Sequence, residues 1–384
     1  MHEPITATAD LEEFIERALA SDRYAIDTEF HREKTYYPKV ALVQMATADE
    51  LVLIDPLEVD LGPLSELLDS DRLCVMHAAS QDLEVMLRSC GVLPRRLFDT
   101  QIAAGFLGLA SASLATLLSR YEAVQLKKGD RLTDWLRRPL SSDQLSYAAA
   151  DVEHLLPAAD KLFSQLSARG RLEWVEDECQ KMLAAATYKR TPAESVRRIK
   201  EARNLKGRAL GIALELVAWR ESRAAEIDVP VRSVLSDIAL VGVAQRAPRT
   251  PEELKGIRGV DGRHTGPQVG PAILEVVSRS RDLEAPAPIK PRGSDLDKGL
   301  RPVVSLVTSW VSQVARDADL DPSMLATRTD VENFLTDGNS SRLDDGWRNE
   351  LIGGPIRMLV RGEAAIAFDG SGGLVLERRS GELL

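Results

Sequence analysis

Four carboxylates constrain the fold of this chain more than any other feature. Asp27 and Glu29 stand two residues apart, whereas Asp82 and Asp151 lie far along the chain. Like charges that are brought close together repel one another unless cations or solvent compensate them. A fold that gathers these four side chains would therefore present an oxygen-rich site for hard metal ions such as Mg²⁺.

Residues 24–30 have the alternation of a β-strand. Asp27 and Glu29 share one face of this predicted strand with Ala25, and the other face is formed by Tyr24, Ile26, Thr28 and Phe30. Two carboxylates beside a sheet core are unfavourable without compensating charge. A solvated strand edge explains the pair equally well, so both interpretations stay open for this segment.

The segment around Asp82 predicts a strand followed by a helix. Residues 73–76 form a short apolar run, and Ser80 is the predicted N-cap of the helix that follows. Asp82 then falls in the first turn, where unpaired amides and the helix dipole favour acidic residues. Taken alone, Asp82 is explained best by this effect.

The segment around Asp151 predicts a helix that Ser141 and Gln144 open as a capping box. Its apolar stripe comprises Leu145, Ala149, Val152, Leu156, Ala159 and Phe163. Tyr147, Asp151 and His154 form a second stripe, so the Tyr147 hydroxyl and the Asp151 carboxylate lie on neighbouring turns of one face. A lone Asp on such a face is usually only solvated.

The combination of the three segments is informative. The pattern D-x-E on a strand, an Asp after H-A-x-S-x, and Y-x-x-x-D on a helix, in this order, resembles the tyrosine-bearing branch of the DEDD 3′–5′ exonucleases, and within it the bacterial ribonuclease D family. Residues 33–38, 40–44, 98–101 and 134–140 fit the same family. The likeness spans roughly the first half of the chain, and such a set is improbable by chance.

The resemblance implies a fold and a site. The fold is α/β: a ribonuclease H-like, mixed-sheet exonuclease domain at 1–188, followed by two small, mainly α-helical HRDC-type domains. Asp27, Glu29, Asp82 and Asp151 would bind two divalent metal ions, Mg²⁺ or Mn²⁺. Tyr147 would orient the attacking water rather than deprotonate it, because a phenol with a pKa of about 10 is a poor base at neutral pH.

Several residues are candidates for contact with nucleic acid. Phe30 is the best candidate for stacking on a base, and the other predicted contacts are Thr28, His77, Lys127, Lys128 and Arg138. A packing role for His77 and a solvated face for the basic residues are the alternatives. The net charge of −10 disfavours nucleic acid on average, but eight basic residues crowd into one stretch, at Lys189, Arg190, Arg197, Arg198, Lys200, Arg203, Lys206 and Arg208.

The second half of the chain reads as amphipathic helices. Residues 205–284 resemble an HRDC domain, which is a nucleic-acid-binding accessory in the family, although small helical bundles also serve as protein contacts. Residues 285–293 are rich in proline and predict an extended linker. Residues 294–384 resemble a second HRDC-like domain, but 364–368 and 374–376 predict a β-hairpin that departs from a purely helical module.

Composition limits the class of protein. At 384 residues and 28% charged residues, the chain predicts a globular protein of several domains without a membrane partner. Three scattered cysteines, Cys74, Cys90 and Cys179, and an N-terminus without the features of a secretory signal, predict a cytoplasmic location.

The implied activity is hydrolysis of RNA from the 3′ end with release of nucleoside 5′-monophosphates. The implied substrates are the 3′ trailers of transfer RNA precursors and other small structured RNAs. A DNA 3′–5′ exonuclease, with single-stranded DNA as partner, is the nearest alternative, because no residue identifies a reader of the 2′-hydroxyl. A non-catalytic nucleic-acid-binding scaffold is a weaker one, because such relatives usually lose acidic ligands and all four are present here.

Overall fold

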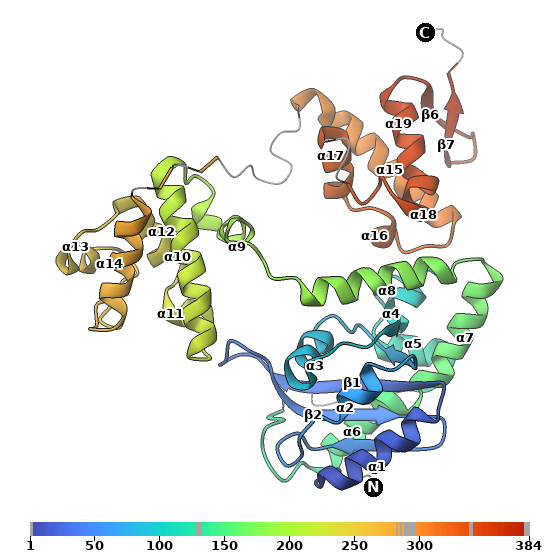
Figure 1. The fold of residues 1–384 in the computed structure, drawn as a ribbon. Helices are drawn as coiled ribbons and strands as arrows, with labels where there is room; N and C mark the ends of the chain where they lie inside the picture. Colours follow the sequence, from blue (N-terminus) through green and yellow to red (C-terminus); the bar gives the residue numbers. More distant parts are fainter. Residues whose placement is uncertain are drawn as a thin grey trace. The chain divides into compact units, whose positions relative to one another are not determined.

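The computed structural model describes residues 3–126, 133–281, 283–284, 286–287, 297–337 and 341–379 (Figure 1). They divide into two compact units. The first, called here the sheet unit, takes the described residues of 1–29, 40–187 and 292–384. The second, the helical unit, takes those of 30–39 and 188–291.

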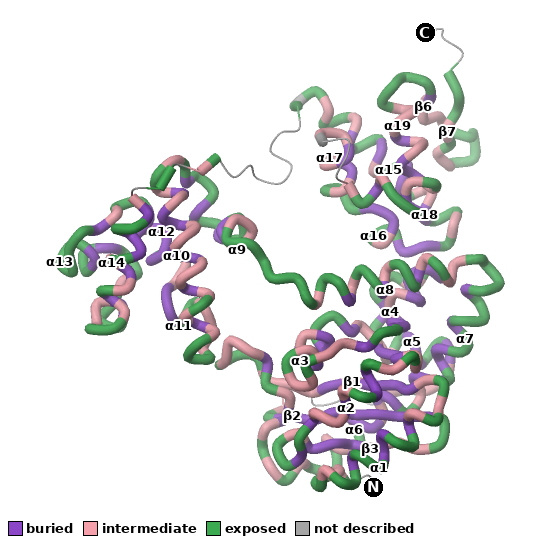
Figure 2. Tube along the Cα trace, viewed as in Figure 1, coloured by how far each residue is buried: buried purple, intermediate pink, exposed green. Residues whose placement is uncertain are grey.

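A five-stranded mixed sheet organises the sheet unit, with the strand order β3-β2-β1-β4-β5. The central strand β1 pairs in parallel with β4, β4 pairs in parallel with β5, and β2 pairs antiparallel with β3. Buried positions run along these strands (Figure 2). The strands are β1 Arg23–His31, β2 Lys39–Ala46, β3 Leu51–Ile54, β4 Leu73–Met76 and β5 Arg96–Asp99.

Helices cover the sheet. Helix α6 packs on β3, α7 on β4 and α8 on β5. Under α6, Trp135, Ala148 and Ala149 bury against Ala41, Leu42 and Leu53. The helices of this part are α1 Thr8–Leu19, α2 Leu64–Leu68, α3 Asp82–Cys90, α4 Thr100–Gly105, α5 Leu114–Tyr121, α6 Ser142–Glu153, α7 Leu155–Ala168 and α8 Leu172–Thr187.

The predicted helix after Ser141 is divided in two. The capping box of Ser141 and Gln144 is present as predicted. The helix breaks at His154, whose ψ of 7° ends α6 and begins α7. The predicted apolar stripe is therefore wrong at its far end, where Phe163 is 48% exposed.

The C-terminal residues form helices and the predicted hairpin. Strands β6 Ala364–Phe368 and β7 Leu374–Arg378 pair antiparallel, which confirms the hairpin. The helices are η2 Lys298–Leu300, α15 Arg301–Asp317, α16 Pro322–Leu325, α17 Arg328–Asp337, α18 Gly346–Arg348, the π-helix η3 Asn349–Gly353 and α19 Gly354–Val360.

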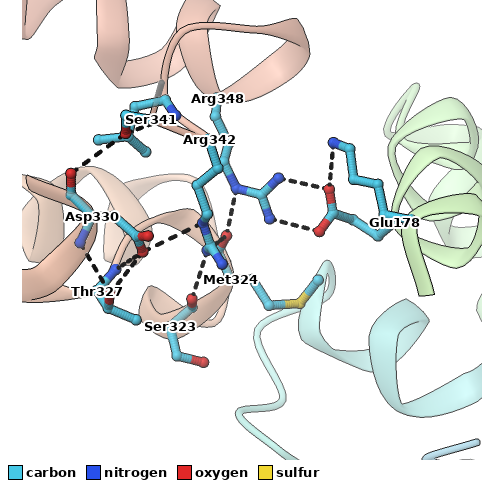
Figure 3. A network of polar contacts seen from close by, with 10 residues as sticks. Glu178, Ser323, Met324, Thr327, Asp330, Ser341, Arg342 and Arg348 are labelled. Atoms are coloured by element: carbon cyan, nitrogen blue, oxygen red, sulfur yellow. Dashed lines mark hydrogen bonds and ion pairs between the residues drawn. The ribbon is translucent and has the colours of Figure 1, made fainter. Parts of the chain in front are cut away.

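These C-terminal residues share one hydrophobic core with the five-stranded sheet and its helices. Trp347 stacks on Trp174 of α8 with ring centroids 5.1 Å apart. The buried guanidinium of Arg348 makes two bonds to the Glu178 carboxylate, at 2.6 and 2.8 Å, and its Nε donates to the Met324 carbonyl (Figure 3). Ionic, aromatic and apolar contacts therefore attach the C-terminal residues to α8.

The helical unit is a small bundle with its own core. Its longest helix, α10 Gly207–Glu226, packs against α12 Asp237–Arg246 and α14 Val269–Ser280. The backbone amides of Tyr36 and Tyr37 both donate to Asp228 Oδ1 at 3.1 Å. The remaining elements are α9 Pro192–Arg198, η1 Lys200–Ala202, α11 Val231–Val234 and α13 Pro251–Lys255.

Two general expectations concern the whole chain. No helix in the described part combines the length and the apolar character that a bilayer crossing requires. Cys74, Cys90 and Cys179 are free thiols, as the absence of a disulfide framework in the sequence predicts.

Candidate metal centre and active site

Three of the four carboxylates meet at the central strand. Asp27 and Glu29 share a face of β1, as the alternation predicts, because successive side chains of a strand point to opposite faces. Helix α6 adds Asp151. One carboxylate oxygen from each of Asp27, Glu29 and Asp151 lies within 4.8 Å of the others. A strand and a helix far apart in sequence thus build one acidic cluster.

Tyr147 lies one turn before Asp151 on α6. Its ring packs beside buried Trp135, with centroids 6.1 Å apart. The capping box at Ser141 fixes where α6 begins, and this fixes which face carries Tyr147 and Asp151. The structure therefore places the phenol on the same helix face as a carboxylate of the cluster.

The fourth carboxylate, Asp82, is the first residue of α3 and is buried. Its Oδ1 accepts a hydrogen bond of 2.5 Å from the hydroxyl of Thr28, which stands between Asp27 and Glu29 on β1. Among the described residues, the group that lies within 4.8 Å comprises the other three carboxylates only. Thr28 nevertheless ties Asp82 to the strand that carries the cluster.

The loop before Asp82 is held in a way that the sequence did not indicate. The predicted Ser80 cap is wrong, because α3 begins at Asp82 and no side chain caps it. Asp99 fixes this loop instead. Its buried carboxylate accepts hydrogen bonds from the backbone amides of Ala78 and Ala79, and it also accepts from the amides of Gln101 and Ile102 as the N-cap of α4. An acidic residue at the end of a neighbouring strand is the only sequence signal for this role.

Charge accumulates at the site. Burial, followed by the charges of Asp82, Asp151 and Glu29, raises the pKa of Asp27 well above its ordinary value. Burial also raises the pKa of Asp82 to about 6, although the Thr28 hydroxyl favours the ionised form. The ionised form of these carboxylates is therefore unfavourable in the folded protein, and bound cations would stabilise it.

Three of the residues predicted to contact nucleic acid also make internal hydrogen bonds. Thr28 is 6% exposed and bonds Asp82. His77 pairs through Nδ1 with the Thr100 hydroxyl at 2.9 Å, and its Nε2 is buried. Arg138 binds the Asp55 carboxylate and the Ala41 carbonyl, which fastens the segment after Trp135 to β2 and β3.

The remaining predicted contacts have different positions. Phe30 is half-buried at the end of β1, directly after Glu29. Lys127 and Lys128 lie outside the described residues. Contact of Thr28, Phe30, His77, Lys127, Lys128 and Arg138 with nucleic acid therefore stays a prediction.

Comparison with known proteins defines the class. A family model for a 3′–5′ exonuclease matches residues 2–167, and a model for an HRDC domain matches residues 209–277. Together with the mixed sheet and its acidic cluster, these matches define a 3′–5′ exonuclease that is followed by an HRDC domain. The exonuclease domain family depends on divalent metal ions.

Relatives of nearly full length identify the family. Ribonuclease D of Gluconacetobacter diazotrophicus is 35% identical over 96% of this chain and 95% of the relative. Ribonuclease D of Nitrobacter hamburgensis is 36% identical over 95% of this chain and 97% of the relative. A crystal structure of Escherichia coli RNase D, described as an exoribonuclease involved in structured RNA processing, matches with a TM-score of 0.84 and 33% identity, over 94% of this chain and 99% of the other.

The chain belongs to the ribonuclease D family. It is a 3′–5′ exoribonuclease, and its substrate is RNA. The predicted resemblance and the predicted α/β fold class are confirmed.

Proposed function

We propose that Asp27, Glu29, Asp82 and Asp151 hold two Mg²⁺ ions and that Tyr147 orients the attacking water. The convergence of Asp27, Glu29 and Asp151 within 4.8 Å is the observation that carries this proposal. The raised pKa of Asp27 supports it, because an acidic cluster of this kind is favourable only with cations nearby. Carboxylate oxygens are also the ligands that Mg²⁺ prefers.

When bound, the two ions would polarise the scissile phosphate and supply a nucleophile at neutral pH. The protein residues then have separate tasks. Thr28 holds Asp82 through the 2.5 Å hydrogen bond to Oδ1, which orients this proposed ligand. Tyr147 offers its hydroxyl as a hydrogen-bond partner to the water, and Phe30, the next residue after Glu29 in the chain, is the proposed stacking partner of the terminal base.

The proposed substrates are 3′ trailers of transfer RNA precursors and other small structured RNAs, and the proposed products are nucleoside 5′-monophosphates. The similar Escherichia coli protein, described as acting in structured RNA processing, supports this choice. The three free thiols support the cytoplasm as the proposed location. The domain limits 1–188, 205–284, 285–293 and 294–384 stay proposals, and the family matches at 2–167 and 209–277 support the first two.

The activity is tested with matched substrates in Mg²⁺. A 5′-labelled RNA hairpin with a single-stranded 3′ trailer should shorten stepwise and release 5′-monophosphates, and the DNA of the same sequence should be cleaved more slowly. Release of nucleoside 3′-monophosphates, or shortening from the labelled end, would exclude the proposed reaction. Faster cleavage of the DNA would favour the DNA alternative.

Metal binding should stabilise the folded protein. In EDTA the clustered carboxylates repel one another, and Mg²⁺ or Mn²⁺ binds only the folded arrangement, so the melting temperature should rise with metal concentration. At a concentration 100 times the dissociation constant, the gain in free energy of unfolding is about 2.7 kcal/mol. Differential scanning calorimetry with and without Mg²⁺ measures it, and superimposable curves would speak against the metal cluster.

A further inference from the structure

A row of exposed cations stands on the helical unit before the residues that match the HRDC model. It comprises Arg197, Arg198, Lys200, Arg203, Lys206 and Arg208, and we call it the basic ridge. All six side chains are exposed, and none forms an ion pair with another described residue. The six residues precede residue 209, where the HRDC match begins, and the buried residues between them belong to the core of the helical unit.

The ridge is built on an ordered backbone. Every third residue, namely Val196, Ile199, Ala202 and Leu205, is buried in the core of the helical unit. Each of these residues from Ile199 onward donates its amide to the carbonyl of the one before, at 3.0, 3.1 and 3.0 Å. The backbone therefore repeats a three-residue step, and each step returns one apolar side chain to the core.

This repeat leaves the cations at exposed positions between the buried residues. The positions between successive buried residues carry Arg197 and Arg198, then Lys200, then Arg203, and Lys206 follows Leu205. Every outward interval thus supplies at least one positive charge. Because the backbone of this segment is already ordered, the protein loses less conformational entropy on binding a ligand than a disordered basic tail would lose.

The charge pattern selects the partner. Glu201 is the only acidic residue between 195 and 208, although the whole chain has a net charge of −10. Unpaired cations in a row repel one another, and a polyanion with repeated charges relieves this repulsion. A lipid surface fits less well, because the apolar residues of the segment are buried and leave no face to insert.

We propose that the basic ridge binds the phosphate backbone of the RNA substrate. The proposal rests on the proposed function for the identity of the polyanion, and it adds a sequence-independent binding surface outside the catalytic cluster. Backbone phosphates are the partner because the exposed groups of the ridge are charges rather than an aromatic stacking platform or a base-reading edge. The ridge then supplies affinity, and the cluster at β1 supplies the chemistry.

The test is the salt dependence of binding, measured in EDTA so that the RNA stays intact. The substitutions R197Q/R198Q/K200Q and R203Q/K206Q/R208Q each remove three charges. Each phosphate contact contributes about 0.7 to 0.9 to the slope of log affinity against log salt. Fluorescence anisotropy with a labelled RNA hairpin should show each triple variant with a slope reduced by about 2 and with affinity lowered at least about tenfold at low salt.

The matched control removes the same charge elsewhere. Arg301, Arg316 and Arg361 are exposed in the sheet unit and form no ion pair with a described residue, so R301Q/R316Q/R361Q should retain the wild-type slope. An unchanged slope in both ridge variants, or an equal loss in the control, would overturn the proposal. Circular dichroism establishes that each variant is folded.

A second measurement needs no variant. RNA bound to the wild-type protein should protect Lys200 and Lys206 from acetylation, read by mass spectrometry, and equal modification with and without RNA would contradict the ridge. Cleavage by the wild-type protein in Mg²⁺ is scored separately. Loss of the proposed function would thus appear as absent cleavage with binding still measurable, whereas failure of the ridge would appear in the slope and in the protection.

Discussion

Asp27→Asn should lower kcat/KM for RNA by more than about 100-fold and raise the melting temperature of the protein in EDTA. Both effects have one cause. Burial and the neighbouring carboxylates raise the pKa of Asp27, so its negative charge is unfavourable in the folded protein without metal. The amide keeps the shape of the side chain, but it removes a charge that metal binding needs. Single-turnover kinetics and calorimetry measure the two effects.

The variant should also lose most of the stabilisation that Mg²⁺ gives to the wild type. Tyr147→Phe is the matched comparison, because Tyr147 lies one helical turn from Asp151 and is not a proposed ligand. It should keep the Mg²⁺-dependent rise in melting temperature and still lose kcat. Cleavage by Asp27→Asn at the wild-type rate, or a full response to Mg²⁺, would exclude Asp27 as a ligand.

The sequence predicted the parts of the site that depend on local physics. The alternation of residues 24–30 placed Asp27 and Glu29 on one face of β1, and the capping box at Ser141 set the start of α6. The C-terminal hairpin follows from an equally local signal. Each of these features involves residues within a few positions of one another, so a single sequence contains the whole pattern.

Features that join distant segments were not predictable in this way. The hydrogen bond from Thr28 to Asp82 spans 54 residues, and the bonds between Arg138 and Asp55 span 83. The sequence indicated Thr28 and Arg138 only as contacts with nucleic acid, and their hydrogen bonds to distant carboxylates became visible only in the folded chain. The same limit applies to Ser80, where the amide bonds of Asp99 to the loop replaced the expected cap.

The largest such feature is the attachment of the C-terminal residues to α8. Arg348 and Glu178 are 170 residues apart, yet their side chains are only 3% and 16% exposed. The Arg348 guanidinium also lies 4.2 Å from the centroid of the Trp347 ring. Nearby, a Cβ added to Gly105 would collide with the sulfur of Met324, so close backbone packing supports the same attachment. Residues 294–384 are the proposed second HRDC-like domain, and their described part packs within the sheet unit.

Arg348→Ala should therefore destabilise the sheet unit strongly. Removing the guanidinium leaves the Glu178 carboxylate buried with Lys181 as its remaining ionic partner (Figure 3). Removing one partner of a buried ion pair lowers the free energy of unfolding by about 3–5 kcal/mol. In a unit of this size the melting temperature should fall by roughly 6 °C or more. The control Arg328→Ala breaks a pair with Glu332 whose arginine is 52% exposed, and it should change stability by less than about 0.5 kcal/mol.

The pH dependence separates the ion pair from simple loss of packing. Burial alone would raise the pKa of Glu178, but the hydrogen bonds and charge of Arg348 outweigh it and lower the pKa from 4.5 to about 2. A carboxyl whose folded pKa lies below its unfolded value contributes stability above the unfolded pKa, and this contribution is lost as the pH falls through the folded pKa. The stability difference between wild type and Glu178→Gln should thus be constant from pH 7 to about 5 and shrink toward pH 2. If the stability difference stayed the same down to pH 3, the destabilisation would come from lost packing rather than from lost charge. A difference that grew on acidification would contradict the ion pair.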